Sequence, residues 1–265
     1  MNNKSDGNEA QRYHALTIAG SDSCGGAGIQ ADIRTMSKLG VQAASVITAV
    51  TAQNTVGVTE VAVMEAGLVE RQLSAVLEDI PVTAAKTGML ANAELIRTIS
   101  RRLDEHPDID LVVDPVMVAT TGARLLDTDA EQELRNRLLP RATLLTPNLP
   151  EARALTGLDD HSDALNLADE MLRLGCKAVL IKGGHGHGAR VEDWLVTRDD
   201  RVCFSNPRID GQVHGTGCAL SAAITAGLAR GLKLDEAVGM AIEWLHGMLD
   251  SAWLPKAGRL RMLPF

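Results

Sequence analysis

Short apolar runs alternate with amphipathic segments along almost the whole chain. Runs of this length, bounded by Gly, Pro or polar residues, are typical of buried strands. The predicted strands cover residues 15–20, 45–50, 60–64, 84–88, 111–116, 143–147 and 178–183. A weaker pair of runs, 193–197 and 201–204, is separated by charged turn residues and predicts a late hairpin.

Apolar residues spaced three and four positions apart predict helices between these strands. One such series runs through Ile29, Ile33 and Met36 and stops at Gly40, and another includes Leu68. Strands that alternate with helices build a mostly parallel sheet with helices on both faces. The sequence therefore predicts an α/β fold, a three-layer α/β/α sandwich.

The two closing helices have the clearest patterns. The first, at about 217–230, is rich in Ala, Ser and Gly and can lie close to a sheet or a ligand. The second, at about 235–250, carries an apolar stripe, and we expect Asp235 to be its N-terminal cap. Because no Pro- or Gly-rich linker divides the chain, we expect a single domain over 14–265 after a disordered lead over 1–13.

Composition and charge exclude several classes of protein. The formal net charge is −8, and the chain has only three Trp, two Phe and one Tyr, which argues against a nucleic-acid partner. No apolar run approaches the roughly 18 residues of a membrane span. The four cysteines are scattered without a C-x-x-C pair, so neither metal-ligand spacing nor an oxidising compartment is indicated. We expect a cytoplasmic protein that binds neither nucleic acid nor a membrane.

The loops after the strands are where chemistry is expected, because open parallel sheets bind ligands at the carboxyl ends of their strands. The first loop runs from Gly20 to Gly28, and its glycine spacing does not match the G-x-G-x-x-G dinucleotide fingerprint. It is either a close approach to a ligand or a tight turn. Asp32, just inside the next helix, can bind a ligand or favour the helix dipole.

Polar residues end three further strands. Gln53 offers a heteroaromatic ring both a donor and an acceptor, although such a cluster is usually only a turn. Asp114 follows an all-apolar strand, where an acid needs a metal, a cation or hydrogen-bond donors. Lys182, followed by two glycines, favours contact with a phosphate.

Asn148 and Glu151 lie three apart at a predicted helix start. This spacing places both side chains on one side of the first turn, which suits water-mediated binding of Mg²⁺ near phosphates. The alternative is a capping box with Asn148 as the cap, and local grounds favour it.

The most specific segment is 213–221, in which Gly215 and Gly217 flank Thr216 directly before the small-residue helix. Successive amides at a helix N-terminus form an anion hole, as the transferring γ-phosphoryl group requires. Cys218 at this helix start is expected to have a lowered thiol pKa and to accept a proton. The alternative is a buried cysteine with no chemical role.

Together these motifs resemble the hydroxymethylpyrimidine/phosphomethylpyrimidine kinases of the ribokinase-like superfamily. The matching segments stand in family order and cover roughly 14 to 245. They are ALTIAGSD, GGAGIQAD, SVITAVTAQNT, KTGML, DPVM, LLTPNLPEA, KGGH and HGTGCALSAA.

The resemblance implies a role for each matching position. The pocket for the pyrimidine ring would be formed by Gly20, Ala27, Asp32 and Gln53. The anion hole would be His214, Gly215, Thr216 and Gly217, and Cys218 would be the base, where ribokinases proper have Asp. Asn148 and Glu151 match a pair near Mg²⁺, and Asp114, Lys182 and His214 would lie beside the ATP phosphates.

The same resemblance implies two successive transfers in thiamine biosynthesis. ATP would phosphorylate 4-amino-5-hydroxymethyl-2-methylpyrimidine, and a second ATP would convert the monophosphate to the diphosphate. The second nucleophile is already a phosphate and needs no strong base. A homodimer is the family-level expectation.

The sequence departs from the family at three places. Ser23-Cys24 replaces the usual Pro-Ser, and Thr120-Thr121-Gly122 lacks the lysine of a Lys-Ser-Gly loop, which puts the diphosphate-forming step in question. The C-terminal segment also differs from the commoner ending.

Three other functions compete with this one. A pyridoxal kinase of the same branch would use the same motifs, because pyridoxal also carries a hydroxymethyl group. A non-catalytic binder of the vitamin precursor would not need the phosphoryl machinery of Asn148, Glu151 and 215–218. The glycine spacing in the first loop argues against a dinucleotide-dependent oxidoreductase.

Overall fold

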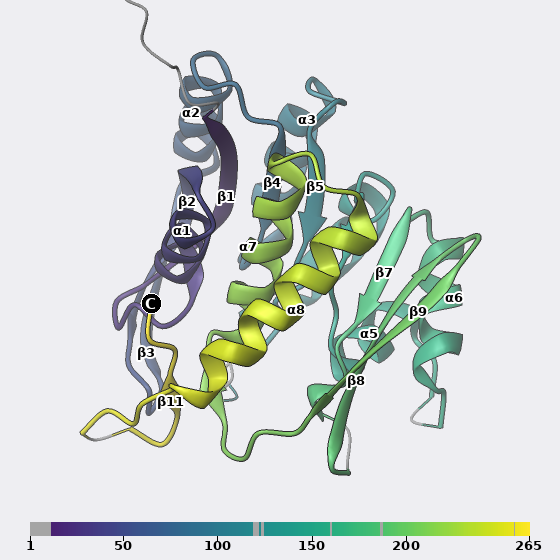
Figure 1. Cartoon of the computed structure of the whole chain (residues 1–265). Coiled ribbons are helices and arrows are strands. Elements are labelled where there is room, and N and C mark those ends of the chain that lie inside the picture. The colour runs from purple at the N-terminus through teal and green to yellow at the C-terminus, as the bar shows by residue number, and fades with distance from the viewer. Residues whose placement is uncertain (1–11, 119–121, 123–124, 160, 186–187, 257) are drawn as a thin grey trace, which may run out of the picture.

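Most strands of the chain are collected in one large sheet (Figure 1). The computed structural model describes residues 12–118, 122, 125–159, 161–185, 188–256 and 258–265. Within these ranges, nine strands follow the order β3-β2-β1-β4-β5-β6-β7-β8-β9. They are β1 (Tyr13–Asp22), β2 (Val41–Gln53), β3 (Val58–Val63), β4 (Ala84–Thr87), β5 (Asp110–Val113), β6 (Leu144–Leu145), β7 (Ala178–Ile181), β8 (Arg190–Thr197) and β9 (Arg201–Pro207).

Every predicted strand is present. The six central strands pair in parallel, whereas β3 at one edge and the β8–β9 hairpin at the other are antiparallel. The mostly parallel sheet and the late hairpin are therefore confirmed. Residues 1–11 of the predicted lead lie outside the described residues, and β1 begins at Tyr13, the last residue assigned to that lead.

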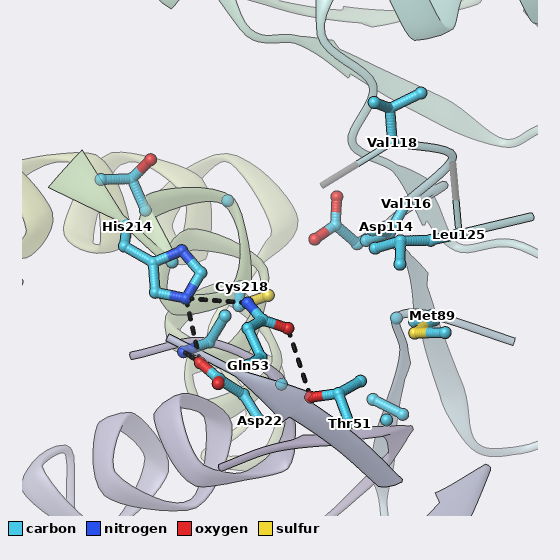
Figure 2. A pocket seen from close by; sticks show the side chains of 18 of the residues that line it. Asp22, Thr51, Gln53, Met89, Asp114, Val116, Val118, Leu125, His214 and Cys218 are labelled. Carbon is cyan, nitrogen blue, oxygen red and sulfur yellow. Dashed lines mark hydrogen bonds and ion pairs between the residues drawn. The ribbon is translucent and has the colours of Figure 1, made fainter. Parts of the chain in front are cut away.

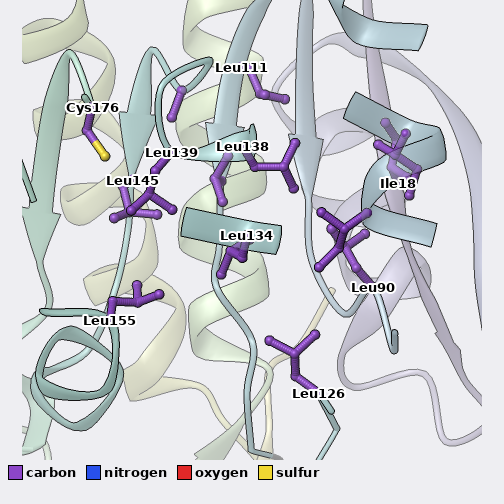
Figure 3. Close-up of a cluster of buried hydrophobic side chains, with 14 of the residues drawn as sticks. Ile18, Leu90, Leu111, Leu126, Leu134, Leu138, Leu139, Leu145, Leu155 and Cys176 are labelled. Carbon is purple, nitrogen blue, oxygen red and sulfur yellow. The ribbon is translucent and has the colours of Figure 1, made fainter. Parts of the chain in front are cut away.

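Helices cover both faces of the sheet, because alternate strand residues point to opposite sides. In β5, Leu111 and Val113 pack into one cluster and Val112 into the other. Leu111 is labelled among the side chains of the first cluster in Figure 3. One face carries α2 (Ala66–Leu77), α3 (Ala93–Asp104), α4 (Thr128–Glu133), η1 (Leu134–Leu138), α5 (Leu149–Thr156) and α6 (Ala164–Arg173). The other carries α1 (Gly28–Lys38), α7 (Thr216–Ala229) and α8 (Leu234–Asp250). The α/β/α sandwich is confirmed.

The closing helices pack closely because α7 is built from small residues. A methyl group at Gly227 would lie 2.8 Å from the Cβ of Ala237 in α8, so only a glycine permits this approach. The prediction that Asp235 caps α8 was wrong. The cap is Lys233, whose amide donates to the Glu236 carboxylate at 3.2 Å, and Asp235 lies in the first turn, where its charge favours the helix dipole.

The C-terminal segment pairs with the segment that precedes α7. Strand β11 (Arg261–Met262) pairs in parallel with β10 (Val213–His214), directly before α7. The unusual ending is thus tied to the segment that carries the expected anion hole. None of the helices in the described part of the chain combines the length and apolarity that a membrane crossing requires.

Candidate active site

A cavity of about 230 Å³ opens at the carboxyl ends of the central strands, where the loops were expected to carry the chemistry (Figure 2). It brings together most of the predicted site residues. Those that line it are Gly20, Ala27, Gln53, Asp114, Asn148, Lys182, His214, Gly215, Thr216, Gly217 and Cys218. Asp32 and Glu151 do not line it.

The loop before α7 depends on Gly215. This residue caps the helix in the left-handed region, with φ 77°, and a Cβ there would overlap the carbonyl oxygen of Gly26. The two loops therefore touch through their backbones, and the first residues of α7, Thr216, Gly217 and Cys218, line the cavity. Free amides at a helix N-terminus favour an anion.

Cys218 lines the cavity as the third residue of α7, but the prediction of a lowered thiol pKa was wrong. Burial, together with the carboxylates of Asp32 and Asp114, raises the pKa of this thiol to about 11. The ammonium of Lys86 and the amide of Gly28 act in the opposite direction and do not compensate. The prediction considered only the helix end and missed two acids from other elements.

An ion pair stands beside the anion loop. The Lys182 Nζ lies 3.0 Å from Asp114 Oδ1, and Asp114 is only 2% exposed. Burial opposes ionisation of Asp114, but Lys182, Lys86 and the Ser221 hydroxyl outweigh it and lower the pKa of the carboxyl group. A Cβ at Gly217 would lie 3.3 Å from Lys182 Nζ, so this cation reaches the loop itself.

Asn148 and Glu151 form the capping box that local grounds favoured. The Glu151 amide donates to Asn148 Oδ1 at 2.9 Å, and the Asn148 amide donates to Glu151 Oε2 at 2.9 Å. Burial, with a contribution from Asp114, raises the pKa of Glu151 to about 7 although Lys182 opposes this. Hard oxygen donors suit Mg²⁺, and because each is already engaged in the cap, this pair fits an ion that keeps its waters.

Asp32, which was predicted to form part of the substrate pocket, does not line the cavity. Its carboxylate is fully buried and lies 2.8 and 2.9 Å from the Nζ of Lys86, which is also fully buried. The Thr17 hydroxyl donates to the same carboxylate at 2.6 Å. Asp32 points from α1 toward the sheet, and no local pattern pointed to its partner Lys86 in β4.

A second network, which sequence reasoning missed, joins the first loop to the anion loop. Asp22 accepts hydrogen bonds from the amides of Cys24, Gly26 and Ala27 at 2.8 to 3.1 Å, and His214 Nε2 donates to it at 2.9 Å. Burial raises the pKa of Asp22, but His214 and these donors outweigh it, and the net shift is downward. The ligand-type atoms of Asp22, Cys24 and His214 lie within 4.8 Å of one another, and the hydrogen bonds among them account for that proximity.

The departures from the family pattern have local consequences. The Ser23 hydroxyl donates to the Gln53 carbonyl and accepts from the Gln53 amide, both at 2.8 Å, so the turn is tied down without the usual proline. The Gln53 side-chain amide nitrogen lies 3.3 Å from His214 Nε2 (Figure 2). Thr120 and Thr121 lie outside the described residues.

A second cavity of about 230 Å³ adjoins the first. The two share Lys182, Gly184, Thr216 and Gly217. Its apolar wall comes from α7, α8 and the segment before them, and its other side from β8 and β9. The apolar residues are Val213, Leu220, Ile242, Leu245 and Leu249. The apolar stripe of α8 was visible in the sequence, but its role in a cavity was not.

Known proteins share this sequence and arrangement. The family model described as phosphomethylpyrimidine kinase matches residues 22–262. A hydroxymethylpyrimidine/phosphomethylpyrimidine kinase of Salmonella typhimurium is 44% identical over 253 residues, covering 94% of this chain and 95% of that protein. A protein of the same name from Rhizobium meliloti is 49% identical over 245 residues, covering 90% of this chain and 91% of that protein.

Solved structures agree with these relatives. A phosphomethylpyrimidine kinase from Clostridium difficile superposes with a TM-score of 0.80 at 42% identity, covering 89% of this chain and 99% of that chain. A Bacillus subtilis pyridoxal kinase in complex with ADP gives a TM-score of 0.88 at 33% identity, covering 96% of this chain and 97% of that chain. The fold is ribokinase-like, and the chain belongs to the phosphomethylpyrimidine kinase family.

Proposed function

We propose that the chain transfers the γ-phosphoryl group of ATP to 4-amino-5-hydroxymethyl-2-methylpyrimidine, and then phosphorylates the resulting monophosphate to the diphosphate. One observation carries this proposal: two cavities of similar volume meet at the anion loop, and Lys182, Thr216 and Gly217 line both. A nucleotide in one cavity and an acceptor in the other would face each other across the free amides of α7. Positioning and charge stabilisation of this kind supply most of the catalysis in phosphoryl transfer.

The acceptor belongs in the cavity next to β1 and β2. Gly20 and Ala27 form a wall without bulky side chains, and Gln53 supplies an amide to a ring nitrogen or an exocyclic amine. Met89 lies against Gly20, where its sulfur is 3.1 Å from the position of a Cβ, and offers a polarisable surface to a ring. Asp32 is buried behind this part of the site and does not line the cavity.

The nucleotide belongs in the cavity between α8 and the β8–β9 hairpin. Its aliphatic residues suit the faces of an adenine ring, and the shared end with Lys182 suits phosphates. The Asp114–Lys182 pair then lies beside the β- and γ-phosphates. Because Lys182 is held by Asp114 before the ligand arrives, its charge needs little reorganisation on binding.

In the first transfer, Cys218 is the base. The alcohol oxygen forms a bond to the γ-phosphorus while the bond from that phosphorus to the bridging oxygen of ADP breaks, and the alcohol proton passes to the Cys218 thiolate. A thiol pKa of about 11 leaves less than about one part in a thousand as thiolate at pH 7.5. This still suits a loose transition state, in which the alcohol becomes acidic only as its bond to phosphorus forms.

In the second transfer, the acceptor is a phosphate that is already ionised, so no base is needed. The demand is for a cation and hydrogen-bond donors to hold two phosphate groups in line. Lys182 and the amides at 215–218 supply them in the described part of the chain. The family lysine that Thr120-Thr121 lack would have added another, so this step is expected to be the slower one.

The family also implies a magnesium ion. Asn148 and Glu151 would hold it through water, and the ion would neutralise charge on the transferring phosphates. Glu151 Oε2 lies 3.9 Å from Lys182 Nζ, and this proximity supports a role for the pair on the phosphate side of the site. We further propose that the enzyme is cytoplasmic and works as a homodimer, as the family resemblance implies.

The test is consumption of ATP with Mg²⁺ against three acceptors: the hydroxymethylpyrimidine, its monophosphate and pyridoxal. We expect turnover of the first two. Turnover of pyridoxal alone would reassign the chain to vitamin B6 salvage, a candidate favoured by the close superposition with the Bacillus subtilis pyridoxal kinase. Absence of turnover with all three would contradict a kinase and favour a binding protein.

A further inference from the structure

A buried ion pair lies under the floor of the acceptor cavity. Thr17 in β1 and Lys86 in β4 are neighbours in the parallel register, and both point toward α1. There they meet Asp32, with the Lys86 Nζ 2.8 and 2.9 Å from its two oxygens. All three residues are 0% exposed.

The Lys86 ammonium lies directly behind residues that line the acceptor cavity. A Cβ at Gly88 would lie 3.3 Å from Lys86 Nζ and 3.0 Å from the Cβ of Ala19, and both Gly88 and Ala19 line the cavity. Cys218 lines the same cavity. The ammonium is therefore shielded from water but lies close to the place where the proposed base acts.

Stability alone gives no reason for such a pair. Burying two charges costs several kcal/mol per ion before their attraction is counted, and packed apolar residues of similar volume are often at least as stable. The pair is also coupled to the site. Thr17 and Lys86 hold the Asp32 carboxylate, and both charges of the pair act on Cys218, with opposite signs.

We propose that Lys86 is a positioning residue for the first transfer: its ammonium, fixed by Asp32 and Thr17, is the buried positive charge against which Cys218 ionises before it accepts the alcohol proton. This inference rests on the proposed function. The proton leaves the alcohol oxygen as that oxygen bonds to phosphorus, joins the Cys218 sulfur, and is later released to solvent. Lys86 keeps all its protons throughout.

The charged groups around the Cys218 sulfur determine whether each substitution raises or lowers the pKa of the thiol. Lys86 from β4 and Lys182 after β7 are the cations, and Asp32 from α1 and Asp114 after β5 are the anions. Among these groups Lys86 has the largest effect on the Cys218 pKa, and it lowers that pKa, while Asp32 has the next largest and raises it. Removal of Lys86 should therefore raise the pKa of the Cys218 thiol, whereas removal of Asp32 should lower it.

The test uses Lys86→Met, Asp32→Asn and the double variant in the full chain. The rate at which iodoacetamide alkylates Cys218 at fixed pH reports its thiolate fraction, and peptide mass spectrometry separates it from the other three cysteines. We expect about a tenfold slower alkylation in K86M, a faster one in D32N, and an intermediate rate in the double variant. The double variant carries no unpaired buried charge, so it and D32N still decide the question if K86M does not fold.

Phosphorylation of the two acceptors gives the second readout. The rate with the alcohol should follow the alkylation rate across the series, and the rate with the monophosphate should change less than about twofold, since that step needs no base. Unchanged alkylation in K86M, or equal losses with both acceptors, would overturn the role of Lys86. A Cys218→Ala variant that keeps the alcohol rate would instead refute Cys218 as the base, whatever the alkylation series shows.

Discussion

The contact between Gly215 and the first loop allows a sharp test, because the two loops touch through their backbones. In Gly215→Ala, the new Cβ would overlap the Gly26 carbonyl oxygen, so the loops must separate by about 1 Å. A misplacement of this size costs roughly a hundredfold in rate, or about 2.7 kcal/mol in the barrier. The left-handed φ of 77° adds about 1–2 kcal/mol of destabilisation.

Gly231→Ala is the matched control. Gly231 follows the other end of α7 with φ 82°, and a Cβ there would meet nothing within 4 Å. It should carry the same backbone strain without moving the loops. We expect G231A to lose the stability that the backbone strain costs and G215A to lose more, because its loops must also separate, while only G215A loses kcat/KM, with both acceptors alike. If G215A kept its activity, or G231A lost as much, the loop contact would not be what positions the phosphoryl group.

Three further predictions concern single residues. Cys218→Ala should slow phosphorylation of the alcohol by about 10² to 10⁴ and that of the monophosphate far less, measured as ADP formation; equal losses would indicate a structural role. In the wild type, the rate with the alcohol should rise with pH between about 7 and 9, because the thiolate fraction grows tenfold per pH unit below a pKa of about 11, whereas the rate with the monophosphate should stay nearly flat. Asp22→Asn should lower thermal stability at pH 7; since the pKa of Asp22 is lowered in the folded protein, this stabilisation is present above the unfolded pKa of about 3.8 and fades as the pH falls below it, so the difference from wild type should shrink toward pH 3, and a constant difference would contradict it.

The fold could be predicted because its signals are local. The alternation of Leu111, Val112 and Val113 between two apolar layers needs only the strand geometry, and the capping box of Asn148 and Glu151 needs only three residues of spacing. The anion loop was predictable for the same reason: Gly215 lies directly before the small-residue helix. The resemblance to a known family then predicted that these segments meet in one site.

The electrostatics of the site could not be predicted in this way, because they depend on distant partners. Asp22 and His214 are 192 residues apart, and Asp32 and Lys86 are 54 apart. The expected lowered pKa of Cys218 was wrong because a helix end was weighed without the burial of the thiol and without the carboxylates of Asp32 and Asp114. Asp32 itself had two local interpretations, and only the fold revealed that it faces inward.

The most direct test of phosphoryl transfer at the junction of the two cavities is a crystal structure with the hydroxymethylpyrimidine and a non-hydrolysable ATP analogue. We expect the γ-phosphoryl group on the amides of residues 215–218, the adenine against Leu220 and Ile242, and the acceptor hydroxyl beside the Cys218 sulfur. Ligands that left the amides at 215–218 without phosphate, or an acceptor hydroxyl that pointed away from Cys218, would contradict the proposed mechanism.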